Sequence, residues 1–190
     1  MGITHTSLER INRYLKPQDH ILILGCQNLY DSENYGEIAH LYFEANGYTV
    51  RSLDILGCQC SEALDLRNDL KFSPVYNTIL QHGTVEHVDG SLYQPFKNIH
   101  NACKAVGVMI HENPARDNWP GHGYHYFHLL FYTELAEACG YEILELTEEF
   151  AMGNTVDGKN ISTVLKKTND NDFISEEIFN EIYAKHICSK

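Results

Sequence analysis

The sequence has little positive charge. Its 14 Lys and Arg residues stand against 26 Asp and Glu residues, which gives a net charge of −12 at pH 7. No stretch gathers the basic residues into a stripe, whereas a nucleic-acid-binding protein usually neutralises several phosphates with clustered Lys and Arg. We therefore expect no nucleic-acid partner.

Long hydrophobic runs are also missing. No stretch approaches the roughly 20 apolar residues that span a bilayer, and the first residues lack the basic start and apolar segment of a secretory signal. With 190 residues and no repeat or low-complexity tract, the chain has the length of one domain. We expect a single cytoplasmic domain over 1–190 with no membrane partner; the oligomeric state is left open.

Closely spaced cysteines are scarce. Of the six cysteines only Cys58 and Cys60 are near each other, and a single intervening residue is poor spacing for a zinc knuckle or a redox pair. Cys103 and Cys139 fall on apolar helix faces, where a thiol behaves as a small hydrophobe. The expectation is six reduced, structural cysteines.

Apolar periodicity predicts an alternation of helices and strands. The alternation indicates a doubly wound α/β domain, with helices on both faces of a mostly parallel seven-stranded sheet and a C-terminal antiparallel hairpin. The core covers about 18–168, with a helix added at each end. Strands are expected at 21–24, 48–54, 63–66, 75–83, 106–111, 141–150 and 160–168, and helices at 6–15, 35–46, 95–103, 131–139 and 173–187.

In such a sheet, ligands bind at the carboxyl ends of the strands. Gly25 follows the first strand, where a residue without Cβ lets the backbone turn and approach a ligand; it is equally compatible with a simple turn. Asp54 follows the second strand and is placed to accept hydrogen bonds from ribose hydroxyls, although a helix N-cap is the alternative. Asp65 could accept from an exocyclic amine while Leu66 covers an adenine face.

These junctions resemble those of class I S-adenosylmethionine-dependent methyltransferases. The resemblance is strongest in "YNTILQHGTVEHVDGSLYQPFKNIHNACKAVGVMIHENP" and continues in "FYTELAEACGYEILEL". The family turn Lys-Pro-Gly-Gly reads "KAVG" here, and the acidic-x-Gly-x-Gly loop has Ile23, Gly25 and Gln27 at its marked positions. The resemblance implies S-adenosylmethionine as cofactor, held by Gly25, Cys26, Gln27, Asp54, Ile55, Asp65, Leu66, His82 and Gly83.

The resemblance further implies methyl transfer to a small molecule, at a hydroxyl or amine of a sugar or other metabolite. Such a nucleophile benefits from a nearby base, and histidine is suited to that role near neutral pH. The candidate bases are His125 first, then His122 and His87. A metal site built from His111, Glu112, His122 and His125 is a weaker possibility, and no metal is expected.

Two alternatives to this function stay open. Because Gln27 stands where a glycine is expected, the chain could be a catalytically inactive S-adenosylmethionine-binding protein. The histidine-rich loop 111–128 could instead serve a metal-dependent hydrolase.

Overall fold

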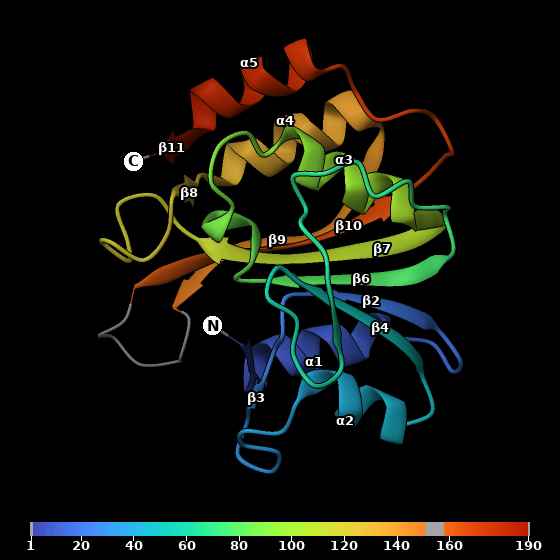
Figure 1. The fold of residues 1–190 in the computed structure, drawn as a ribbon. Helices are drawn as coiled ribbons and strands as arrows, with labels where there is room; N and C mark the ends of the chain where they lie inside the picture. Colours follow the sequence, from blue (N-terminus) through green and yellow to red (C-terminus); the bar gives the residue numbers. More distant parts are fainter. Residues whose placement is uncertain (1, 151–157, 190) are drawn as a thin grey trace.

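A computed structural model describes residues 2–150 and 158–189, and its centre is a seven-stranded sheet (Figure 1). The strand order is β5-β4-β2-β6-β7-β10-β9. The bounds are β2 (His20–Leu24), β4 (Thr49–Asp54), β5 (Ser61–Ala63), β6 (Tyr76–His82), β7 (Cys103–Pro114), β9 (Tyr141–Phe150) and β10 (Lys159–Lys167). The first five pair in parallel, and β10 runs antiparallel to both β7 and β9. The predicted sheet and its C-terminal hairpin are confirmed, while residues 151–157 of the hairpin loop lie outside the described residues.

Helices cover both faces of the sheet. The helices α1 (His5–Tyr14) and α2 (Ala39–Ala45) lie on one face, and α3 (Tyr93–Ala102), α4 (Leu129–Cys139) and α5 (Glu176–His186) lie on the other (Figure 1). Alternate side chains of a strand point to opposite faces. In β2, accordingly, Ile21 and Ile23 join the apolar cluster with Phe43, while Leu22 and Leu24 join the cluster with Phe96.

Local signals account for several helix boundaries. Thr4 caps α1 by accepting a hydrogen bond from the Ser7 backbone N–H, and Ser175 caps α5 through Ile178. Gly140 ends α4 at φ +70°, a conformation that favours glycine. The predicted helix at 35–46 is shorter than expected, because α2 begins only at Ala39.

Very short strands escaped the sequence pattern. The strands β1 (Ile3–Thr4) and β3 (Leu29–Tyr30) pair with each other, as do β8 (His125–Phe127) and β11 (Ile187–Ser189). Two or three residues are too few to display a period. The predicted third strand is also displaced, from 63–66 to Ser61–Ala63.

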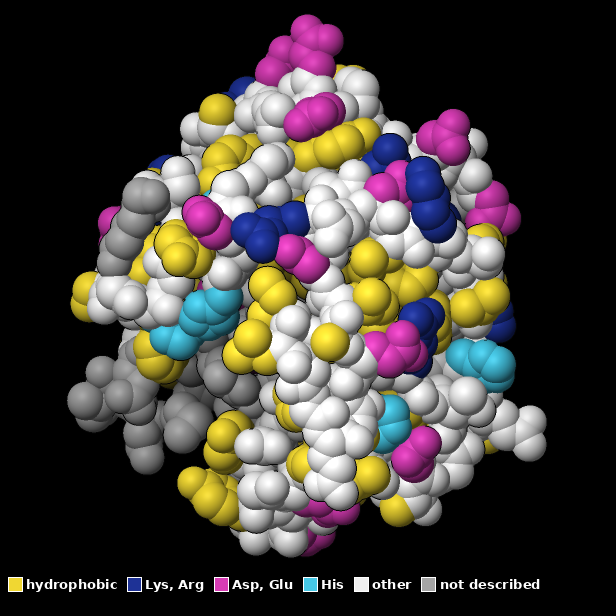
Figure 2. Space-filling view, viewed as in Figure 1, with side chains coloured by type: hydrophobic (Ala, Val, Ile, Leu, Met, Phe, Trp, Pro, Cys, Tyr) yellow, Lys and Arg dark blue, Asp and Glu magenta, His cyan; other side chains and the backbone are white. Residues whose placement is uncertain are grey.

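The surface charges and the helix lengths are relevant to the expectation that the chain has no nucleic-acid or membrane partner. On the face shown in Figure 2, Lys and Arg side chains lie among Asp and Glu side chains rather than in one continuous patch. No helix within the described residues is long and apolar enough to cross a membrane. The absence of a nucleic-acid partner stays a prediction.

Candidate functional site

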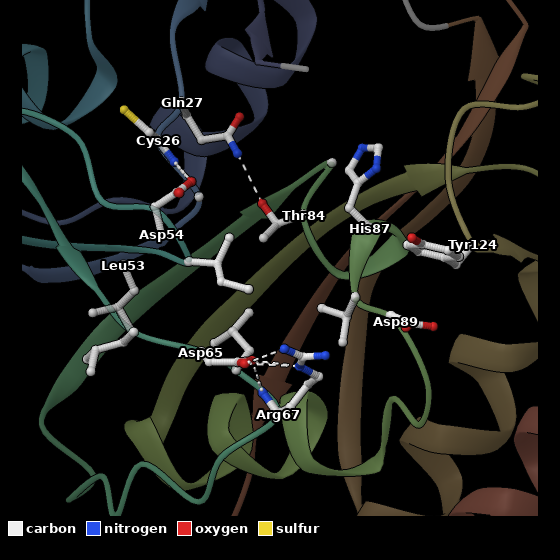
Figure 3. Close-up of a pocket in the computed structure, with 16 residues that line it drawn as sticks. Cys26, Gln27, Leu53, Asp54, Asp65, Arg67, Thr84, His87, Asp89 and Tyr124 are labelled. Atoms are coloured by element: carbon white, nitrogen blue, oxygen red, sulfur yellow. Dashed lines mark hydrogen bonds and ion pairs between the residues drawn. The ribbon is translucent and has the colours of Figure 1, made fainter.

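A cavity of about 320 Å³ lies at the carboxyl ends of β2, β4 and β6, the edge where open α/β sheets bind ligands. Leu53 and Asp54 lie on one side of it, and His87, Asp89 and Tyr124 lie on the opposite side (Figure 3). The residues that line it are Gly25, Cys26, Gln27, Leu53, Asp54, Ile55, Leu64, Asp65, Leu66, Arg67, Gly83, Thr84, His87, Val88, Asp89 and Tyr124.

Gln27 braces the loop after β2 against the loop after β6. Its Nε2 donates to Thr84 Oγ1 at 3.1 Å (Figure 3). The same Nε2 donates to the Leu24 carbonyl at 3.1 Å, and Thr84 Oγ1 donates to that carbonyl at 2.8 Å. Gly25 has φ +86°, and a Cβ there would lie 2.5 Å from Gln27 Nε2 and 2.6 Å from Thr84 Oγ1. Only glycine therefore fits this turn without displacing the brace.

One acceptor in this brace has no partner. Gln27 is 5% exposed, and its Oε1 is buried without a hydrogen-bond partner among the described residues. A buried unsatisfied oxygen is costly, and this one belongs to a residue that lines the cavity.

Two aspartates that line the cavity have different hydrogen-bond partners. Asp54 fixes the first loop, since its Oδ2 accepts from the Cys26 backbone N–H at 3.0 Å and its Oδ1 from the Leu56 N–H at 2.9 Å. An ionised carboxylate has further lone pairs, which leaves Asp54 able to accept from a ligand as well. Asp65 is paired with Arg67 at 2.7 Å, and this guanidinium lowers the pKa of the Asp65 carboxyl.

The expectation of six reduced cysteines is wrong for two of them. A disulfide joins Cys26 to Cys58, with their Cα atoms 6.4 Å apart. The two residues follow β2 and β4, which are parallel neighbours, so the sheet brings together thiols that are 32 residues apart. Their spacing along the chain gave no sign of the pairing. Cys60, Cys103, Cys139 and Cys188 are free.

Glu86, His87 and His122 form a cluster beside the cavity. Glu86 Oε1 lies 3.7 Å from His87 Nε2 and 3.8 Å from His122 Nε2, and the ligand atoms of all three lie within 4.8 Å of one another. Burial raises the pKa of Glu86 to about 8 and lowers the pKa of both histidines. Of these three residues, only His87 lines the cavity itself.

His125 lies outside this cavity, in the lining of a second one of about 410 Å³ that shares Asp89 and Tyr124 with the first. Both ring nitrogens of His125 are engaged, Nδ1 with the Tyr183 hydroxyl at 2.7 Å and Nε2 with the Val88 carbonyl at 2.8 Å. These contacts hold the ring in place and leave it no free nitrogen for an acceptor.

The remaining predicted residues lie inside the fold. His82 is 1% exposed, does not line the cavity, and approaches Glu112 at 4.0 Å. Burial lowers the pKa of both His82 and His111 to about 3. Glu112 accepts hydrogen bonds from Ser7 and Asn160. Among the described residues, the four that suggested a metal site are not grouped; the cluster found instead shares only His122 with them.

Sequence reasoning missed seven lining residues. Most of them adjoin a residue that was predicted, so the same strand ends would have indicated them; Tyr124 alone comes from the histidine-rich loop. They are Leu53, Leu64, Arg67, Thr84, Val88, Asp89 and Tyr124.

Comparison with known proteins shows similarity in structure and not in sequence. No family model and no curated protein matches the sequence. The 1,6-didemethyltoxoflavin-N1-methyltransferase of Burkholderia thailandensis, solved with 1,6-didemethyltoxoflavin and S-adenosylhomocysteine, is similar with a TM-score of 0.67 and 13% identity, over 87% of this chain and 78% of that one.

Two further methyltransferase structures are similar. An S-adenosylmethionine-dependent methyltransferase of Methanosarcina mazei has a TM-score of 0.60 and 13% identity, over 83% of this chain and 96% of that one. The N-methyltransferase NodS of Bradyrhizobium japonicum, solved with S-adenosylhomocysteine, has a TM-score of 0.57 and 14% identity, over 87% of this chain and 89% of that one. At these identities the similarity establishes a shared fold, as the sequence resemblance predicts.

Proposed function

We propose that this chain binds S-adenosylmethionine in the cavity at the carboxyl ends of β2, β4 and β6 and transfers its methyl group to a small polar acceptor. One observation carries the proposal. Of the nine residues predicted to hold the cofactor, all except His82 line this single cavity. The fold shared with methyltransferases solved with S-adenosylhomocysteine supports it.

The residues present fit the cofactor. Gly25 makes the tight turn that lines the cavity, Asp54 has lone pairs for the ribose hydroxyls, and the Oε1 of Gln27 lacks a donor that an ammonium group would supply. Leu66 supplies an apolar surface for a base, and Asp65 can accept from an exocyclic amine that replaces one of the Arg67 donors. The bound cofactor would supply a methyl group on a positively charged sulfur.

The second cavity suits the acceptor. It adjoins the first through Asp89 and Tyr124, and polar side chains dominate its lining, among them Ser91, Glu176 and Asn180. Hydroxyl and amine groups are the natural partners of such side chains. Two of the similar structures are N-methyltransferases by name, which agrees with an acceptor of this kind.

The first experiment measures cofactor binding. Isothermal titration of the purified chain with S-adenosylmethionine and S-adenosylhomocysteine should give one site. Asp54→Asn should weaken both affinities at least tenfold, because the amide keeps the steric volume but loses the charge and acceptor capacity needed for the ribose. Asp69→Asn is the matched control, since Asp69 is outside the cavity and pairs with Lys71 on the surface. No binding by the folded wild-type chain would overturn the proposal.

The second experiment measures turnover. Formation of S-adenosylhomocysteine is followed with a panel of hydroxylated and amine-bearing metabolites, with cofactor alone as the blank. Acceptor-dependent turnover supports an enzyme. Tight cofactor binding without turnover on any acceptor would favour the catalytically inactive binding protein.

A further inference from the structure

We propose that Glu86, His87 and His122 form a binding site for a divalent transition-metal ion, with open coordination positions that face the cofactor cavity. The metal site rests on the geometry of these three residues. The role of its open positions, which is to bind oxygen atoms of the methyl acceptor, rests on the proposed function.

The three side chains are spaced as ligands of one ion. Glu86 Oε1 is 3.7 Å from His87 Nε2 and 3.8 Å from His122 Nε2, with all three ligand atoms within 4.8 Å. Ligand atoms about 2.1 Å from a common ion are at most about 4.2 Å apart. Side-chain shifts of a few tenths of an ångström would therefore bring them into coordination.

Two of the ligand atoms have no other partner. Glu86 is fully buried, and both its Oε1 and the Nε2 of His122 are buried without a hydrogen-bond partner among the described residues. Buried polar atoms in native proteins are nearly always satisfied by protein, water or an ion. These two point toward each other and toward His87, so a single cation would satisfy both.

The backbone around the cluster brings the histidine-rich loop close to Glu86. A Cβ on Gly123 would lie 2.8 Å from the Glu86 carbonyl oxygen, and the Tyr124 N–H donates to that oxygen at 2.7 Å. The His122 N–H donates to the Trp119 carbonyl at 3.0 Å, which fixes the turn that carries the imidazole. A glycine at position 123 is thus what allows His122 to reach Glu86.

A second layer of side chains orients the carboxylate. Asn113 Nδ2 donates to Glu86 Oε2 at 3.1 Å, and the Tyr132 hydroxyl donates to Asn113 Oδ1. Both Asn113 and Tyr132 are fully buried. Outer partners of this kind fix the orientation of a metal ligand, and here they leave Oε1 as the free oxygen.

The donor set indicates the class of metal. Two imidazole nitrogens and one carboxylate oxygen suit zinc and its first-row neighbours better than magnesium or calcium, which prefer oxygen ligands alone. Three protein ligands leave at least one position open. The His87 side chain is 44% exposed and lines the cofactor cavity, so the open side faces that cavity, which adjoins the second cavity proposed for the acceptor.

Such an ion would perform the task that a general base otherwise performs. Coordination lowers the pKa of a bound hydroxyl, whose proton is then lost to solvent near neutral pH. An acceptor with two adjacent oxygen atoms would bind best, since it could occupy two positions at once. With a metal ion in this role, the reaction would not need His125 as a base, and both of its ring nitrogens are engaged in hydrogen bonds.

The test titrates metal-free protein with Zn²⁺ and, for its visible spectrum, with Co²⁺, in the absence of any cofactor. We expect one equivalent to bind, with an affinity that falls at least a hundredfold in Glu86→Gln and in His122→Gln. His5→Gln is the matched control, because His5 lies 3.4 Å from Glu9 in an exposed histidine–glutamate pair. Thermal unfolding of each metal-free variant verifies that it is folded.

The outcomes are distinguishable from those of the proposed function. Unchanged metal affinity in both folded variants, or no stoichiometric binding by the wild-type chain, would overturn the metal site even if S-adenosylmethionine binds. Metal binding without cofactor binding would instead sink the methyltransferase proposal and leave the metal site standing. Acetohydroxamic acid, a two-oxygen chelator, should change the Co²⁺ spectrum; no change would mean that the open positions do not exist.

Discussion

Replacing Gly25 by alanine tests the geometry of the loop on which the proposed cofactor site depends. Gly25 has φ +86°, and an added Cβ would lie 2.5 Å from Gln27 Nε2 and 2.6 Å from Thr84 Oγ1. Gly47 has nearly the same backbone conformation, φ +87°, but nothing lies within 4 Å of the corresponding Cβ position. Comparing Gly25→Ala with Gly47→Ala therefore separates the cost of backbone strain from the cost of steric crowding.

The expected magnitudes follow from these two contributions. A left-handed conformation costs a residue other than glycine about 1–2 kcal/mol, and the reduced freedom of the unfolded chain returns about 0.4–1 kcal/mol. Gly47→Ala should therefore lower the free energy of unfolding by about 1 kcal/mol. Crowding adds roughly 1–3 kcal/mol, so we expect Gly25→Ala to cost about 2–4 kcal/mol.

Urea-induced unfolding measures both variants, by circular dichroism and by the fluorescence of Trp119, the only tryptophan. Gln27→Ala in the Gly25→Ala background should recover part of the difference, because it removes one of the two crowded atoms. Equal destabilisation by Gly25→Ala and Gly47→Ala would refute the argument that Gln27 and Thr84 close over Gly25.

Three further predictions concern the rest of the molecule. Burial lowers the pKa of His111 to about 3 from 6.5, so as the pH falls the unfolded chain binds this proton before the folded chain does. The free energy of unfolding of the wild type should therefore drop, relative to that of His111→Phe, by about 1.4 kcal/mol per pH unit between pH 6 and 4. If urea titrations gave the wild type and His111→Phe the same dependence of unfolding free energy on pH, this prediction would be wrong. Thiol titration of denatured protein should find four reactive cysteines before reduction and six after it. Loss of the Cys26–Cys58 disulfide should lower the free energy of unfolding by about 3–4 kcal/mol. Six reactive thiols before reduction would count against the disulfide. Lys167 donates to two backbone carbonyls at 3.0 Å, so Lys167→Met should lower the free energy of unfolding by about 2–3 kcal/mol in denaturant titrations. Lys166 forms an exposed ion pair, so Lys166→Met should cost under about 1 kcal/mol. Equal losses in the two variants would refute the role of the buried amine.

The sheet was predictable because its central strands, such as β2 and β6, are buried on both faces. Apolar runs such as 21–24 and 75–83 are long enough to be recognised, and the Gly, Pro and Ser residues between them mark the helix boundaries. The hairpin followed from two strands with no helix between them. The short paired strands β1 and β3 were not predictable, since their pairing depends on contacts between segments that carry no period of their own.

The candidate site was predictable where the sheet itself positions the residues. Gly25 and Gly83 follow strands and Asp54 ends one, all at the same edge of the sheet, so their neighbourhood depends on strand order. Contacts that cross between loops were not predictable. The disulfide of Cys26 with Cys58, and the approach of His122 to Glu86, require loops of particular shape, and the sequence pattern specifies that shape only through isolated signals such as Gly123.

Gln27, which stands where the resembling family has a second glycine, restrains the loop after β2. A second glycine would leave the loop after β2 free to adopt several conformations, and Gln27 instead ties that loop to Thr84 and to the Leu24 carbonyl. The disulfide at Cys26 and the hydrogen bond from Cys26 to Asp54 restrain the same loop from the other side. A loop held at three points loses less conformational entropy when a ligand binds. The restrained loop therefore supports the proposal that Gln27 preorganises the cofactor site, in which a donor on the ligand would satisfy the Gln27 Oε1.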